Sequence, residues 1–140
     1  MSGFEIKRNQ QGRGFTLVEL LMVIFIATIL AAVAIPIMFA RINSAKWSEG
    51  KAMAGTIASA IRTWTAGSDQ RGLWTEQELP AARLGIQDKD LKGAYFNKDD
   101  FQWQVDYDGI DLVYVITINK PDGIGSPEKI MLDNSGNWSE

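Results

Sequence analysis

The side chain with the most unusual surroundings in this sequence is the carboxylate of Glu19. It lies in the stretch GRGFTLVELLMVIFIATILAAVAIPIM, and the chain is apolar almost without a break from Phe15 to Ala40. Glu19 is the only charged side chain between Arg13 and Arg41. A carboxylate inside hydrocarbon costs on the order of 2.5–3.5 kcal/mol even on the lenient insertion scale. That cost requires a partner for Glu19, and the apolar stretch offers no basic side chain.

The residue inventory excludes the commonest catalytic and metal-binding chemistry. The 140 residues include no His and no Cys. A disulfide framework, a zinc site of the usual type and a Ser-His or Cys-His nucleophile pair therefore cannot be built. The net charge of −3 argues against a general nucleic-acid binder, which needs a basic face to displace counterions. We expect no catalytic residue, no cofactor and no nucleic-acid partner.

One segment near the C-terminus has some features of a calcium loop. The sequence DNSGN at residues 133–137 supplies carboxylate and amide oxygens. Its glycine, Gly136, comes too early for the known calcium-loop pattern. An ordinary turn is therefore favoured, and no metal site is predicted.

Charge and hydropathy divide the chain into a basic leader at residues 1–14, an apolar helix at residues 15–40 and a globular domain at residues 41–140. A helix of about 26 residues spans roughly 39 Å, enough to cross a hydrocarbon core of about 30 Å. The positive-inside rule places the basic N-terminus in the cytoplasm. Pro36 removes one backbone hydrogen bond and is expected to kink or loosen this helix around residues 32–36.

The helix is expected to run on into the globular domain, from about Phe15 to Ala66. Its second half is amphipathic, which indicates packing against its own domain. The predicted apolar stripe comprises Ile42, Ala45, Met53, Ile57, Ala60, Ile61 and Trp64, and the predicted solvent side comprises Lys46, Lys51, Ser59 and Arg62.

Strand patterns follow the helix. Alternating or β-branched runs predict strands at residues 101–107, 112–118 and 129–132, with a hairpin turn at Asp108-Gly109. Thr75 and Glu78 have capping-box spacing for a helix that Pro80 keeps short, and Trp138 is expected to fold back on the domain. The predicted fold class is α+β, a long N-terminal helix packed on a small antiparallel sheet of three to four strands.

The segment RGFTLVELLMVIFIATILAAVAIPIM resembles the N-terminus of type IV pilins and of the pseudopilins of type II secretion. The shared features are a basic leader that ends in Gly14, then Phe15, then Glu19 as the fifth residue after that junction, and an apolar helix that contains Pro36. The resemblance covers roughly residues 8–65. Beyond it, the chain agrees with the family only in architecture.

The resemblance implies a processing event and a route to assembly. A membrane-embedded prepilin peptidase would cut between Gly14 and Phe15 and methylate the new N-terminus of Phe15. The subunit would lie in the lipid of the bacterial inner membrane as a single-pass protein, until an inner-membrane assembly platform adds it to an extracellular or periplasmic filament of identical subunits.

Within this scheme Glu19 and Pro36 are assembly residues. The implied partner of Glu19 is the α-amino group of Phe15, either of the same subunit or of an adjacent one, as the family implies. A pair between subunits would set their axial register, because an unpaired acid in a dry core is costly. Snorkelling of the carboxylate to the lipid headgroups is the alternative.

The implied function is that of a structural pilus subunit. Two alternatives stay open, namely a pseudopilin of a type II secretion system and a single-pass membrane-anchored binding module that does not polymerise. The lack of Cys departs from pilins that close a C-terminal loop with a disulfide. That departure leaves a pseudopilin or a minor pilin open.

Overall fold

The computed structural model describes residues 14–140, so the predicted leader, apart from Gly14, lies outside the described part. The chain divides into two units, of which the first ends at Met38 and the second runs from Phe39 to Glu140. One helix, α1 (Leu17–Ala66), passes through Pro36 without a break. The long helix that the sequence predicted is thus present, and it begins two residues later than predicted.

In the first unit the apolar side chains of α1 are exposed all round the helix. From Leu17 to Met38 the large apolar side chains are 52–79% exposed, and the first buried residue of the helix is Trp47. This part of α1 is long and apolar enough to cross a membrane. Its residues therefore have a surface that suits lipid or other apolar helices rather than water.

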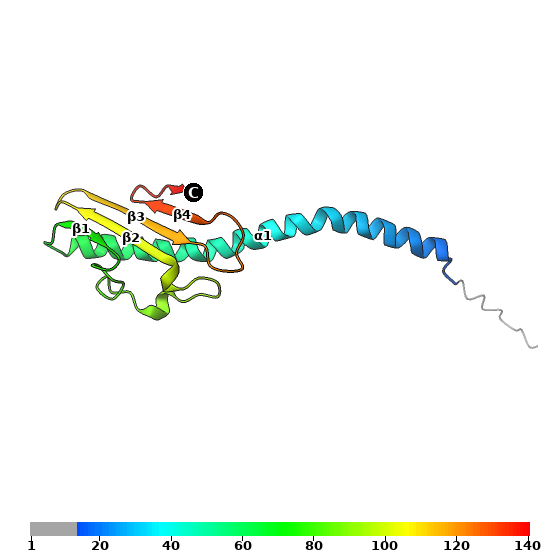
Figure 1. The fold of residues 1–140 in the computed structure, drawn as a ribbon, viewed down its shortest axis with the longest axis horizontal. Helices are drawn as coiled ribbons and strands as arrows, with labels where there is room; N and C mark the ends of the chain where they lie inside the picture. Colours follow the sequence, from blue (N-terminus) through cyan, green and yellow to red (C-terminus); the bar gives the residue numbers. More distant parts are fainter. Residues whose placement is uncertain (1–13) are drawn as a thin grey trace, which may run out of the picture. The chain divides into compact units, whose positions relative to one another are not determined.

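The second unit contains one antiparallel sheet of five strands (Figure 1). The strands lie side by side in chain order: β1 (Gly72–Thr75), β2 (Phe101–Tyr107), β3 (Leu112–Asn119), β4 (Lys129–Asp133) and β5 (Trp138–Ser139). The three predicted strands are confirmed, and the predicted total of three to four is too low. The two edge strands are short and mostly exposed, so neither gives a run of alternating residues long enough to detect in the sequence.

The second half of α1 packs along one face of this sheet (Figure 1). The predicted stripe is right for Ile57 and Ile61 but wrong for Ile42 and Ala45, which are exposed. The buried residues of the helix are Trp47, Gly50, Ala54, Ile57, Ala58, Ile61 and Thr65. Lys46 is also not a free solvent-side residue, because its ammonium group donates to a loop between two strands. Sequence periodicity could not show that contact.

The strands bury the residues that alternation predicts. Phe101, Trp103 and Val105 of β2 face the core, whereas Tyr107 at the end of the strand is only half-buried. Trp103 Nε1 donates to the carbonyl oxygen of Leu79 at 2.9 Å, which ties the sheet to the segment after β1.

The predicted turns are present, with one difference. The β2–β3 hairpin turns at Asp108-Gly109, where Gly109 has a φ of 100° that favours glycine. The carboxylate of Glu78 accepts hydrogen bonds from the backbone N–H and the hydroxyl of Thr75, at 3.0 and 3.2 Å. The contacts of the Glu78 side chain therefore form as in a capping box, but the N–H of Glu78 donates to the carbonyl oxygen of Thr75, and this segment folds into successive turns rather than a short helix.

Candidate processing and assembly site

The predicted cleavage point lies in a non-helical, exposed segment just before α1. Gly14 and Phe15 precede the helix, and the side chain of Phe15 is 85% exposed. A Cβ atom built on Gly14 would meet no other atom within 4 Å. The packing of residues 14–140 does not itself require glycine there. A requirement for Gly14 would have to come from an enzyme that approaches the backbone closely.

Glu19 belongs to a capping box at the start of α1. Its Oε2 accepts hydrogen bonds from the backbone N–H and from the hydroxyl of Thr16, both at 2.9 Å. In return, the backbone N–H of Glu19 donates to the Thr16 hydroxyl at 3.2 Å. The first N–H groups of a helix have no partner within the helix, and this arrangement satisfies two of them. The carboxylate thus has hydrogen-bond donors in its own chain.

This capping box was missed in the sequence, although its signal was there. Thr16 and Glu19 have the same T-x-x-E spacing as Thr75 and Glu78. The partner predicted for Glu19, the α-amino group of Phe15, exists only after cleavage, because until then that nitrogen is the amide joined to Gly14. Cleavage would create the amine one residue before Thr16, at the same end of the helix.

Between residues 17 and 40 the chain has one polar side chain besides Glu19, that of Thr28. Its hydroxyl donates to the carbonyl oxygen of Phe25 at 2.8 Å. Both polar side chains of residues 17–40 therefore find partners within their own chain. That is what a segment needs in hydrocarbon, where water cannot satisfy polar groups.

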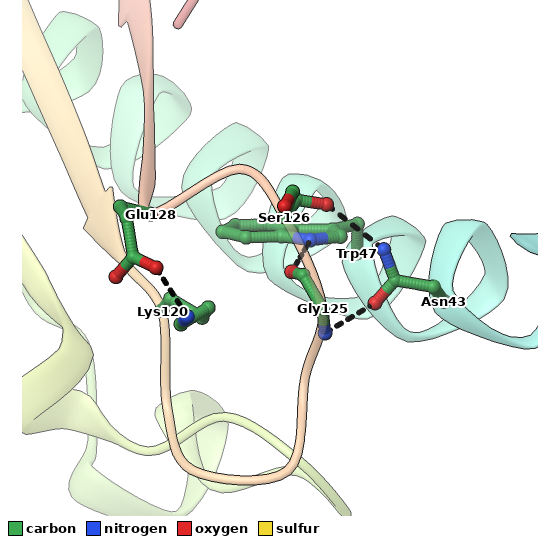
Figure 2. Close-up of polar contacts among 6 residues, drawn as sticks. All are labelled: Asn43, Trp47, Lys120, Gly125, Ser126 and Glu128. Carbon is green, nitrogen blue, oxygen red and sulfur yellow. Dashed lines mark hydrogen bonds and ion pairs between the residues drawn. The ribbon is translucent and has the colours of Figure 1, made fainter.

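A second cluster of contacts ties α1 to the loop of residues 120–128 between β3 and β4 (Figure 2). Asn43 makes two of them: its Oδ1 accepts from the N–H of Gly125 at 2.7 Å, and its Nδ2 donates to the carbonyl oxygen of Ser126 at 2.9 Å. Trp47 Nε1 donates to the carbonyl oxygen of Gly125 at 3.2 Å. The loop backbone is thus held by two side chains on successive turns of α1.

The same loop is closed at its base and held at its tip. Lys120 and Glu128 form an ion pair (Figure 2), and the N–H of Lys120 donates to the carbonyl oxygen of Glu128 at 2.9 Å. Lys46 Nζ donates to the carbonyl oxygen of Gly123 at 2.9 Å. The contacts of Asn43, Lys46 and Trp47 join residues 77–83 positions apart in the sequence, and together they fix the start of the amphipathic half of α1 to the sheet.

A third junction joins α1 to the segment before β2 through Glu49. One carboxylate oxygen, Oε1, accepts from the backbone N–H groups of Tyr95 and Phe96, at 2.8 and 3.1 Å. The N–H of Tyr95 makes the largest contribution to holding the pKa of Glu49 below its usual range, against a smaller opposing effect of desolvation. Gly93 lies directly against this carboxylate, where a larger side chain would collide with it.

The turn at residues 133–137 uses its carboxylate locally. Asp133 Oδ1 accepts from the backbone N–H groups of Asn137 and Ser135, at 2.8 and 2.9 Å, and these bonds, that of Asn137 above all, lower the pKa of Asp133. Among residues 14–140 no three His, Cys, Asp or Glu side chains gather closely enough to hold a metal ion.

The described residues thus define a class of protein. Its members have an exposed segment before the helix, a capped helix start that carries one acidic side chain, and an exposed apolar helix that continues into an α+β domain. Residues 8–35 match the family model described as the prokaryotic N-terminal methylation motif. The chain therefore carries the prepilin motif of type IV pilins and pseudopilins. Neither the curated proteins nor the solved structures include a match to this chain.

Proposed function

We propose that this protein is a structural subunit of a type IV pilus or pilus-like filament, processed between Gly14 and Phe15 and polymerised through its N-terminal helix. The observation that carries this proposal is the methylation motif at residues 8–35, which leads into a helix whose first half, up to Met38, exposes its apolar side chains all round. A basic leader explains why such a helix stays in the membrane until the leader is removed.

The apolar half of α1 suits two successive environments. In the bilayer the carboxylate of Glu19 keeps the Thr16 hydrogen bonds, which reduces the cost of placing it in hydrocarbon. In a filament core the cleaved N-terminus of Phe15 on a neighbouring subunit supplies a cation. A carboxylate in a dry core is tolerated only where a cation lies beside it. Neighbouring helices are therefore favoured at the axial offset that brings Glu19 to this N-terminus, and this offset is the register of the subunits.

The partners follow from this route. A prepilin peptidase removes the leader, the inner membrane holds the subunit as a single-pass protein with its N-terminus in the cytoplasm, and an assembly platform adds it to a filament outside that membrane. A catalytic role is not proposed, and the absence of His and Cys supports a structural one.

One observation favours a pseudopilin as the second candidate. The chain has no Cys, so its C-terminal segment is held by strand pairing instead of a disulfide. Leu132 pairs with Trp138 across β4 and β5, and Lys51 Nζ lies 5.2 Å from the centre of the Trp138 ring. A pseudopilin of type II secretion would use the same processing and polymerise into a short periplasmic fibre.

Intact mass is the test of this proposal. We expect the chain purified from membranes to begin at Phe15 and to carry one extra methyl group, and we expect Gly14→Val to retain the leader. Gly55→Ala is the control, because its added methyl group meets no atom within 4 Å on α1. A wild-type chain that keeps residues 1–14 would instead support the membrane-anchored binding module.

Electron microscopy of sheared surface fibres distinguishes a major pilin from a pseudopilin. Long fibres composed mainly of this chain would indicate a major pilin. A processed chain that forms fibres only when overproduced in cells with a type II secretion system would indicate a pseudopilin.

A further inference from the structure

The last two residues of β2 and the turn that follows, residues 106–111, form the end of the β2–β3 hairpin, which carries acidic side chains and one exposed apolar side chain. We call it the acidic turn. Asp108 Oδ1 accepts from the backbone N–H groups of Ile110 and Asp111, both at 2.7 Å, which fixes the backbone. Ile110 is nonetheless 88% exposed, the highest value among the exposed large apolar side chains of the described chain. A fixed turn that presents an apolar side chain loses little entropy on binding.

Two carboxylates of the acidic turn have no cationic partner. The ion pairs within residues 14–140 are Lys98–Asp88 and Lys120–Glu128, so the exposed side chains of Asp106 and Asp111 are in none. A nearby cation, Arg71, lies against Gly109 and contributes to lowering the pKa of Asp108, after the larger effects of the Asp111 and Ile110 N–H groups. The acidic turn therefore offers negative charge on both sides of Ile110.

The complementary group lies on α1, at the start of the second unit. Arg41 is exposed and is in no ion pair of the described residues. Two exposed apolar side chains flank it, Phe39 at 68% and Ile42 at 41%. The next cation along the helix, Lys46, is already used by the β3–β4 loop. Arg41 and its neighbours thus form a cationic, apolar surface, the Arg41 patch.

The acidic turn and the Arg41 patch lie at opposite ends of the second unit. The turn between β2 and β3 lies at the same end of the second unit as the C-terminal end of α1 (Figure 1). The helix rises by roughly 37 Å between Arg41 and Ala66. The two surfaces therefore cannot meet within one molecule, and each is available to another copy.

We propose that the acidic turn of one subunit docks on the Arg41 patch of a second copy of this chain. Asp106 and Asp111 face the Arg41 guanidinium, and Ile110 packs against Phe39 and Ile42. Contacts between unlike surfaces that do not close on themselves produce open filaments. Complementary charge selects the partner and its register. This inference rests on the proposed function and adds to it a contact between globular units.

Disulfide trapping tests the contact directly, because the natural chain has no Cys. One copy carries Ile110→Cys and a second, differently tagged copy carries Ile42→Cys, so that Arg41 and both acids are retained. Oxidation with copper phenanthroline in cells with surface fibres should link the two tags, since a disulfide forms only when the two Cα atoms approach within about 7 Å. Ile110→Cys paired with Lys92→Cys is the control and should remain unlinked.

Charge reversal tests the energetics. Arg41→Glu, and separately Asp106→Lys with Asp111→Lys, should each lower the yield of sheared fibres on the order of tenfold, since attraction becomes repulsion. All three substitutions together should restore the yield, because the opposite charges again face each other. Lys92→Glu and Asp99→Lys are exposed controls elsewhere on the unit and should leave the yield unchanged. Intact mass should show the same processing in every variant.

The outcomes separate this inference from the proposed function. Fibres in which the Ile110→Cys and Ile42→Cys copies stay unlinked, or in which the combined reversal gives no rescue, would overturn the contact and leave the pilus proposal standing. A wild-type chain that is unprocessed and forms no fibres would overturn both. A specific link together with rescue would establish the contact.

Discussion

Gly50 on α1 is the position where the structure makes its sharpest quantitative prediction. A Cβ atom added there would lie 2.9 Å from Cζ of Phe96 and 3.0 Å from both of its Cε atoms. The Phe96 ring cannot easily move, because it is fully buried and packs against Trp47 and Phe101 with ring centroids 5.4 and 6.1 Å apart. We therefore expect Gly50→Ala to overpack the core.

Two effects of opposite sign decide the size of the change. Replacing glycine by alanine inside a helix stabilises by about 0.8–1.0 kcal/mol. Overpacking a well-filled core costs about 1–3 kcal/mol, and the enclosed ring favours the upper part of that range. Gly50→Ala should therefore lower the free energy of unfolding by about 1–2 kcal/mol. For a unit of this size that corresponds to a fall in Tm of roughly 4–16 °C.

Gly55→Ala on the same helix is the matched control. Its added methyl group meets no atom within 4 Å, so only the helix-propensity gain of about 1 kcal/mol remains. Thermal unfolding of the full chain in detergent, followed by the near-ultraviolet circular dichroism of its Trp residues, compares the two variants. Equal stability of Gly50→Ala and Gly55→Ala would show that Phe96 does not pack on Gly50 as described.

Three further predictions concern the polar junctions. Glu49→Gln keeps an oxygen acceptor but loses the charge. Because the folded pKa of Glu49 is depressed, its contribution is present above its ordinary pKa and is lost as the pH falls through the folded value. The variant should be less stable at neutral pH in denaturant titrations, with the difference vanishing in acid. Asn43→Ala should speed hydrogen exchange of the Gly125 amide and lower the free energy of unfolding by about 1–2 kcal/mol. Asn43→Asp retains the acceptor oxygen and should keep that amide protected. Equal exchange rates in the two variants would refute the Asn43 contact. Glu19→Ala should leave the intact mass of the cleaved chain unchanged but reduce methylation or fibre yield. Glu19→Gln, which can still accept from Thr16, should also reduce fibre yield if charge pairing with Phe15 sets the register, and normal fibres in both variants would count against that role.

The strongly periodic elements of the fold could be predicted from the sequence. The α1 helix and strands β2, β3 and β4 are long enough to show a pattern of apolar and polar residues in the sequence. In each element the pattern follows the helical or strand period, because that period decides which residues face the same side. Strands β1 and β5 were missed, since an edge strand of two to four residues is defined by the strand that it pairs with. The partly wrong helix stripe at Ile42 and Ala45 has a similar cause, since neither position is covered by the sheet or a loop.

The candidate site divides in the same way. The sequence alone indicated the junction at Gly14 and Phe15, the acid at Glu19 and the apolar helix, and residues 8–35 match the methylation motif. These features are local: the proposed cleavage would act on a non-helical segment, and a charge within an apolar run is visible without knowledge of the fold. The Thr16 partner of Glu19 was also local, and its spacing could have revealed it.

Only the tertiary structure decided which polar groups meet across the globular unit. Nothing in the sequence pairs Asn43 with Gly125, or Glu49 with the backbone of Tyr95, because these contacts join positions 46 to 82 residues apart. The same is true of Gly50, whose missing side chain makes room for Phe96. Local patterns fix what each segment becomes, whereas the packing of helix on sheet fixes which backbone groups lie within hydrogen-bonding distance.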